Sequence, residues 1–163
     1  LHKGLPAAEI AARIDKGEPH ALRLDMAAAI ERAREISGQA RISYLAFDDD
    51  GHKRRVIADP ARWGDAVIVR KDVPASYHLA VVVDDHRQGI THVTRGKDLE
   101  AATDLHRLLQ VLFGFEAPRY HHHRLLLDEG GVKLAKRSGS ESLRSLREKG
   151  LTPEDIRRMI TAD

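Results

Sequence analysis

Two lysines and an arginine lie close together after a pair of glycines, in the segment KLAKR. Lys133 and Lys136 are three residues apart, Arg137 follows, and Gly130 and Gly131 come just before. Such a loop suits a triphosphate, because its cations can stabilise the charge that develops on departing pyrophosphate. The glycines would let the loop close over a ligand. The same residues also fit a charged surface hairpin, and the P-loop pattern is absent from the sequence.

Tyr77 and Arg95 are candidates for binding a polar or anionic substrate. Arg95 follows a predicted strand, and ligands of open α/β sheets bind at the carboxyl ends of the strands. A guanidinium in that place can bind a carboxylate through two hydrogen bonds. Tyr77 could supply a hydroxyl group, but neither residue alone indicates a particular substrate.

Two further groups could bind a metal ion or serve the structure alone. His121 and His123 share a face if residues 119–127 form a strand, so they could coordinate one ion, or that face could simply be exposed to water. No acidic cluster near them completes a site. Asp84 and Asp85 could bind Mg²⁺ or act as structural charges. We predict no protein-bound metal.

Composition limits the class of protein. The 163 residues are 42% apolar, 32% charged and 4% aromatic, with no cysteine and a net charge of +2. These values predict one folded domain, or a domain with a small appendage, without disulfides. No apolar run reaches the roughly 20 residues of a membrane span, so we expect no membrane partner and a cytoplasmic location. Basic residues are dense from 119 to 158, which suits a polyanion or an exposed surface whose charges are offset by acids.

The first third of the chain reads as a small α+β unit. Its expected elements are a helix over 6–16, a strand over 21–26, a helix over 27–36, and a hairpin of strands 42–47 and 54–58.

The pattern changes after Trp63. We expect strands over 66–69, 90–94 and 119–127, a helix over 98–113, and two short helices over 142–149 and 153–160. Residues 77–85 fit either a strand or a helix. This alternation predicts an α/β fold with a parallel sheet.

Several of these segments together resemble one family. Residues 77–99 (YHLAVVVDDHRQGITHVTRGKDL), residues 117–127 (APRYHHHRLLL) and the KLAKR segment are similar to the second half of the catalytic domain of class I glutamyl-tRNA synthetases, in which KLAKR corresponds to the KMSKS signature loop. The resemblance covers residues 63–158. It implies the second half of a Rossmann-like parallel sheet, with a small α+β insertion subdomain before it and a short helical tail. The implied domains are a zinc-less connective subdomain (1–62), the half-sheet with its signature loop (63–138) and the tail (139–163).

Within the family, the ending SGSESLRSLREKGLTPEDIRRMI resembles the shortened branch of glutamyl-Q tRNA(Asp) synthetases. The chain also stops soon after KLAKR, which favours this branch if the end is natural. The implied reaction joins glutamate to ATP, which carries Mg²⁺, and transfers the activated glutamate to the queuosine base of tRNA(Asp). The alternatives are a truncated ordinary synthetase acting on tRNA(Glu), or a non-catalytic tRNA-binding fragment.

The resemblance assigns roles residue by residue. Tyr77 and Arg95 match residues that contact glutamate, and Lys136 matches the catalytic second lysine of the signature loop, which meets the ATP phosphates. Lys133 matches the first lysine of that loop and is also expected to bind ATP.

Two departures from the family pattern matter. The HIGH-type motif is absent, as are the arginine and the acid that complete glutamate recognition from the first half of the domain. The chain is therefore expected to carry only the C-terminal part of the site and to be inactive alone. The zinc-binding cysteines are absent too, and residues 1–26 offer no substitute, so we predict no zinc.

Overall fold

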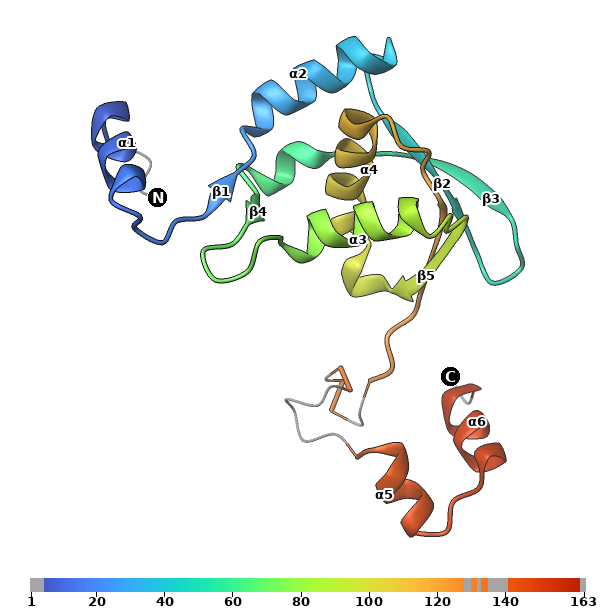
Figure 1. Ribbon diagram of the computed structural model, residues 1–163. Helices are drawn as coiled ribbons and strands as arrows, with labels where there is room; N and C mark the ends of the chain where they lie inside the picture. The colour runs from blue at the N-terminus through green and yellow to red at the C-terminus, as the bar shows by residue number, and fades with distance from the viewer. Residues whose placement is uncertain (1–4, 128–129, 132, 135–140, 162–163) are drawn as a thin grey trace. The chain divides into compact units, whose positions relative to one another are not determined.

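The computed structural model describes residues 5–127, 130–131, 133–134 and 141–161 (Figure 1). The chain divides into two compact units, Leu1–His123 and Arg124–Asp163. The elements of the first unit, in chain order, are α1 (Ala7–Asp15), β1 (Leu22–Arg23), α2 (Met26–Ser37), β2 (Ser43–Phe47), β3 (Lys53–Ile57), η1 (Pro60–Trp63), β4 (Val67–Val69), α3 (Tyr77–Arg87), β5 (His92–Gly96), η2 (Lys97–Leu99), α4 (Ala102–Phe113) and β6 (Arg119–His123).

The main sheet has four strands in the order β3-β2-β6-β5. Strands β2 and β3 form an antiparallel hairpin, whereas β5 and β6 are parallel and in register from the pair His92–Arg119 to the pair Gly96–His123. β2 joins β6 in parallel at the pair Ala46–Tyr120. The predicted α/β class with a parallel sheet is confirmed. Among the described strands, β3 and β5 form the two edges of this sheet.

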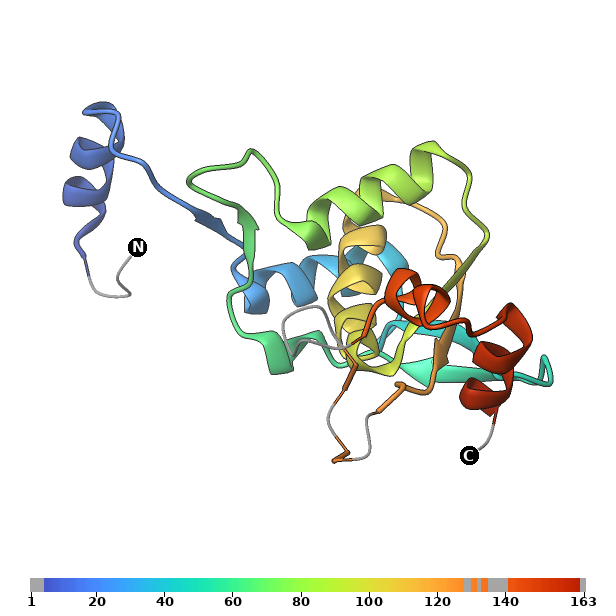
Figure 2. The same ribbon diagram turned by 90° about the horizontal axis from the view of Figure 1, so that it is seen from below.

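Helix α4 lies at the centre of the hydrophobic core. Leu105, Leu108 and Leu109 are at most 2% exposed. Helices α2 and α3 both pack against α4, which lies between them in both views (Figures 1 and 2). Tyr44 of β2 and Tyr120 of β6 belong to the same core, and their rings meet edge to face at 5.4 Å. Because α4 is covered on several sides, most of its polar residues are buried as well.

Four polar side chains of α4 illustrate this. Thr103, Asp104, His106 and Gln110 are between 0% and 4% exposed. Buried polar groups need partners, since an unpaired one costs about 1–3 kcal/mol. Asp104 pairs with Arg62 at 3.2 Å, and the Gln110 amide donates to the Tyr120 hydroxyl at 2.7 Å. Thr103 and His106 bond to a different group, described below.

Helix α3 resolves the ambiguity at residues 77–85 in favour of a helix. The Ser76 side chain caps it by accepting a hydrogen bond from the Leu79 amide at 3.3 Å. Val82 is 2% exposed and joins the core beside α4. The cap and the packing therefore override the strand preference of the three valines.

The N-terminal elements are smaller. Helix α1 has no buried residue, and β1 pairs with β4 in an antiparallel ribbon that matches Leu22 with Val69. The four-stranded sheet contains strands from both sides of residue 62, and the division expected there remains a prediction.

The second unit contains helices α5 (Leu143–Glu148) and α6 (Pro153–Thr161). Thr152 caps α6 in a reciprocal arrangement: its hydroxyl accepts from the Asp155 amide, and the Asp155 carboxylate accepts from Thr152. The strand expected over residues 119–127 is wrong in length. β6 ends at His123 because its partner β5 ends at Gly96, and Leu127 instead forms an isolated bridge with Lys133.

No helix in the described part of the chain is long and apolar enough to cross a membrane.

Candidate functional site

Arg95 lies one residue before the end of β5 and is only 8% exposed. The sheet places it at the carboxyl end of a parallel strand, where ligands of such sheets bind. Its guanidinium carbon lies 5.3 Å from the centre of the Tyr120 ring on the neighbouring strand. The structure therefore places a buried cation beside an aromatic ring at the carboxyl end of these parallel strands.

Helix α4 supplies two partners for Arg95. Thr103 and His106 are three residues apart and so project from one side of the helix. The Arg95 Nη1 donates to His106 Nδ1 at 3.1 Å, and Nη2 donates to Thr103 Oγ1 at 2.5 Å.

Strand β6 supplies the third partner. The Arg95 Nε donates to His122 Nε2 at 3.4 Å, and Thr103 Oγ1 lies 2.9 Å from the same nitrogen. The Thr103 oxygen accepts from Arg95, so its own hydrogen is free to bond His122 Nε2. His122 therefore acts as an acceptor at Nε2, which requires its proton to be on Nδ1.

A second histidine extends the network toward α3. His106 Nε2 lies 3.0 Å from His78 Nδ1. Because His106 Nδ1 accepts from Arg95, a neutral His106 ring carries its proton on Nε2 and donates it to His78. The bonds thus run in one direction from Arg95 through His106 to His78.

The histidines of this network are held neutral. Burial, followed by the nearby charge of Arg95, lowers the pKa of His106 to about 3 and that of His122 to about 4. The same two causes lower the pKa of His78. Within the part of the chain that the structure describes, no carboxylate forms an ion pair with Arg95. Burial raises the pKa of Asp85 and the charge of Arg95 partly offsets this rise, so one carboxylate lies within electrostatic range of Arg95 without bonding to it.

Tyr77 begins helix α3 and is exposed. Its ring centre lies 5.5 Å from that of His78 and 5.8 Å from that of His106, edge to face in both cases. His106 in turn bonds Arg95. One buried histidine thus contacts both Tyr77 and Arg95, the two residues that the family resemblance suggested for glutamate.

Of the two lysines in the KLAKR segment, Lys133 is among the described residues and belongs to the second unit. Lys133 pairs with Leu127 in the isolated bridge, whereas Lys136 and Arg137 fall outside the described residues. Their roles remain predictions from the family resemblance.

The predicted site residues did not include Thr103, His106, His122 or His78. The helical pattern gave no signal for Thr103 and His106: the apolar residues of α4 fall on one side, and these two residues lie on the polar side, which is usually exposed. His122 belongs to the YHHH segment, in which the spacing suggested its neighbours His121 and His123 as metal ligands.

The histidines on the other face of β6 have structural partners. His121 stacks on Phe47 at 5.2 Å and lies 3.0 Å from the Asp49 carboxylate. Among the described residues, one group of three could hold an ion: Asp48, Asp50 and His52, on the exposed β2–β3 turn. The Asp48 carboxylate already accepts the backbone amides of Asp50 and His52, which is ordinary turn chemistry.

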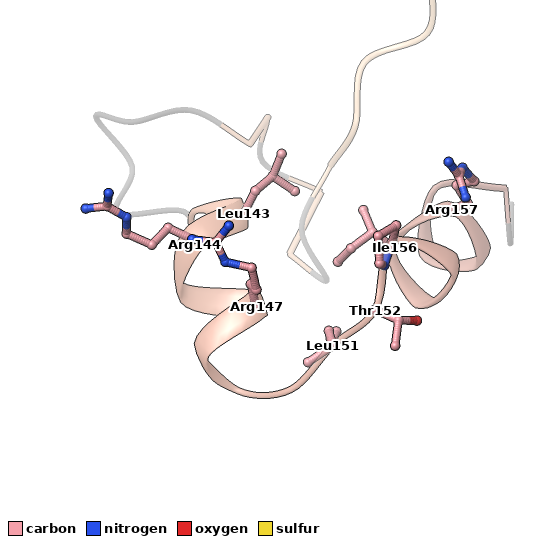
Figure 3. Close-up of a pocket in the computed structure, with 8 residues that line it drawn as sticks. Leu143, Arg144, Arg147, Leu151, Thr152, Ile156 and Arg157 are labelled. Atoms are coloured by element: carbon pink, nitrogen blue, oxygen red, sulfur yellow. The ribbon is translucent and has the colours of Figure 1, made fainter.

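The second unit contains a groove of about 370 Å³ between α5 and α6 (Figure 3). Its apolar lining includes Leu143, Leu151 and Ile156, and Arg144, Arg147 and Arg157 also line it. Such a surface combines apolar contact with cations that could meet phosphate groups.

Comparison with known proteins identifies the family. The model of the class I tRNA synthetase (E and Q) catalytic domain matches residues 4–162. The chain belongs to this family. This confirms the predicted relation to the class I aminoacyl-tRNA synthetases, a family of ligases.

Individual relatives agree with this assignment. A glutamyl-Q tRNA(Asp) synthetase of Rhodobacter capsulatus is 43% identical over 155 residues, which cover 90% of the chain and 53% of that protein. A glutamate–tRNA ligase of Chlamydophila psittaci is 36% identical over 160 residues, or 98% of the chain and 29% of that protein. The chain thus spans about half of the first synthetase and less than a third of the second.

Solved synthetases share the fold. A glutamate–tRNA synthetase of Elizabethkingia anophelis superposes with a TM-score of 0.56 and 31% identity, over 83% of the chain and 25% of that protein. A glutamate–tRNA ligase of Elizabethkingia meningosepticum, crystallised in complex with its amino acid, gives the same TM-score and identity over 24% of its length. The predicted relation to class I glutamyl synthetases is confirmed.

Proposed function

We propose that the chain forms the glutamate-binding, C-terminal part of an active site that activates glutamate with ATP. The observation that carries this proposal is the buried Arg95 guanidinium, which has neutral partners and lies one histidine away from Tyr77. A buried cation whose hydrogen-bond partners are all neutral favours an anionic ligand, because a carboxylate bound to it would supply negative charge and further hydrogen bonds.

The proposed reaction has two steps. A carboxylate oxygen of glutamate attacks the α-phosphorus of ATP, and the bond to the departing pyrophosphate breaks, which gives glutamyl-adenylate. A hydroxyl group of the tRNA then attacks the activated carbonyl carbon and displaces AMP. Arg95 and Tyr77 would hold glutamate in place, which accelerates the first step by orienting the reactants.

ATP enters this reaction as its Mg²⁺ complex, so the metal is part of the substrate. Lys136 would stabilise the charge on departing pyrophosphate, and Lys133 would assist in binding the phosphates. These two roles rest on the resemblance of KLAKR to the signature loop.

Glutamyl transfer to the queuosine base of tRNA(Asp) is the proposed second step. The 43% identity to the glutamyl-Q synthetase of Rhodobacter capsulatus supports it, and the 36% identity to a glutamate–tRNA ligase keeps tRNA(Glu) as the second candidate. The arginines that line the α5–α6 groove could contact the phosphate backbone of either RNA. A protein with such a substrate works where tRNA is found, so the proposal includes a cytoplasmic location.

Two assays separate the possibilities. Exchange of labelled pyrophosphate into ATP, measured with the full-length protein that carries this chain, should require glutamate and should not respond to glutamine or aspartate. Absence of glutamate-dependent exchange would contradict the proposal and favour a non-catalytic RNA-binding role. Charging of purified tRNA(Asp) that contains queuosine, compared with tRNA(Glu), then decides between the two synthetase functions.

A further inference from the structure

We propose that His106, supported by Thr103 and His122, is a positioning residue for glutamate recognition: it orients the Arg95 guanidinium while leaving the charge and two N–H groups of Arg95 for the substrate. The inference rests on the proposed function and concerns residues that would not touch the substrate themselves.

The hydrogen bonds of Arg95 fix its guanidinium and leave two N–H groups for a ligand. A guanidinium has five N–H groups, one on Nε and two on each terminal nitrogen. The three described partners bond to three different nitrogens: His122 to Nε, His106 to Nη1 and Thr103 to Nη2. These bonds hold the plane of the group and leave one N–H on each terminal nitrogen. Two N–H groups on adjacent nitrogens suit the two oxygens of a carboxylate.

The hydrogen-bond partners of Arg95 are electrically neutral. Imidazole and hydroxyl groups accept hydrogen bonds without a negative charge, whereas a carboxylate in their place would form an internal ion pair with Arg95. His106 is 1% exposed and Thr103 is 0% exposed, so such a pair would be little weakened by water. Neutral acceptors therefore fix the position of Arg95 without competing with glutamate for its charge. The low pKa of His106 agrees with a neutral ring at physiological pH.

His106 lies between the elements that carry Arg95 and Tyr77. Its ring bonds Arg95 through Nδ1, bonds His78 through Nε2 and meets the edge of Tyr77. His78 itself packs against Trp63, whose indole N–H donates to the Ala101 carbonyl at 3.0 Å. One buried ring thus sets the distance between the end of β5 and the start of α3, the two elements that carry the glutamate-binding residues.

The test compares three substitutions in the full-length protein. His106→Glu places a carboxylate beside Arg95, His106→Leu removes the acceptor, and His106→Gln keeps a neutral acceptor and a donor. We expect the KM for glutamate to rise about a hundredfold, about tenfold and less than threefold, respectively, because hydrogen bonds to charged groups are the stronger ones. The KM for ATP should stay within about twofold of the unsubstituted protein. His92→Leu, at an exposed histidine of the same strand as Arg95, is the matched control and should change neither constant.

The outcomes are distinct. Equal increases in both KM values, or an equal effect of Glu and Leu at position 106, would show that His106 acts only on stability and would overturn the inference. A second measurement needs no variant: nitrogen-15 NMR of the unsubstituted protein should show the His106 proton on Nε2, and a proton on Nδ1 would overturn it as well. Absence of glutamate-dependent exchange in the unsubstituted protein would instead refute the proposed function and, with it, the role assigned to His106.

Discussion

Substitution of Arg95 is the most direct test of the site. Arg95→Leu removes the charge and every donor, whereas Arg95→Lys keeps the charge on one nitrogen. A lysine ammonium has three N–H groups on a single atom, so it cannot reach His122, His106 and Thr103 and also present a planar fork to a carboxylate. The two variants therefore separate the contribution of charge from that of geometry.

The size of the effect follows from the two N–H groups that Arg95 leaves for a ligand. Hydrogen bonds to charged groups contribute about 1.5–3 kcal/mol each, so the loss of both would cost about 3–6 kcal/mol. Since about 1.4 kcal/mol corresponds to a factor of ten, Arg95→Leu should raise the KM for glutamate by at least about a hundredfold. Arg95→Lys, which retains one bond, should raise it by about ten- to a hundredfold.

Glutamate-dependent pyrophosphate exchange over a range of glutamate concentrations measures these constants. Arg119→Leu is a suitable control, because Arg119 is exposed and lies at the opposite, amino-terminal end of the neighbouring parallel strand. A KM for glutamate within twofold of the unsubstituted value in Arg95→Leu, or an equal rise in the KM for ATP, would refute a direct role of Arg95 in binding glutamate.

Three more outcomes are expected. Leu108→Ala should lower the free energy of unfolding by about 2–5 kcal/mol, measured by urea denaturation, because the side chain is fully buried, whereas Ile36→Ala at an exposed site of α2 should change it by less than about 1 kcal/mol. Lowering the pH from 7.5 to 5 should cost about 2 kcal/mol of stability through His106: its folded pKa of about 3 lies below the ordinary histidine value of 6.5, so the contribution is complete above pH 6.5 and is lost as the pH falls towards 3. His106→Gln should remove that part of the pH dependence, and an unchanged slope would show that His106 is not buried as a neutral ring. Lys136→Ala should reduce exchange strongly at saturating glutamate, and a rate near that of the unsubstituted protein would exclude this lysine from the reaction.

Local patterns predicted most of the elements. The stripe of leucines and the terminal glycine define α4, and the hairpin of β2 and β3 surrounds a turn rich in aspartate and glycine. Residues 77–85 stayed ambiguous because valines favour strands, while the hydroxyl of Ser76 favours a helix that begins after it. Only packing against α4 decides between these preferences.

Long-range pairing could not be read from the sequence. The bridge between Ala46 and Tyr120 joins the hairpin to the parallel strands, although these residues are far apart along the chain. The length of β6 depends likewise on where β5 ends, and no local pattern of residues 124–127 records that.

The candidate site was predicted in part. Tyr77 and Arg95 came from the family resemblance, and the structure brings them near each other through His106. Their supporting residues come from α3, α4 and β6, so their proximity appears only once these elements have packed. Thr103 and His106 lie on the polar side of α4, so no pattern in the sequence indicates that they are buried or which partners they meet.

The two edges of the main sheet differ in how they would meet another chain. Strand β3 carries Lys53, Arg54 and Arg55 in succession, and charges on an edge strand discourage a second strand from adding to it. Strand β5 carries His92, Val93 and Thr94 before Arg95. The charged group of Arg95 is buried against His106 and so does not protect this edge. Edge-to-edge aggregation of the isolated chain should therefore begin at β5, and a lysine in place of Thr94 should improve its solubility.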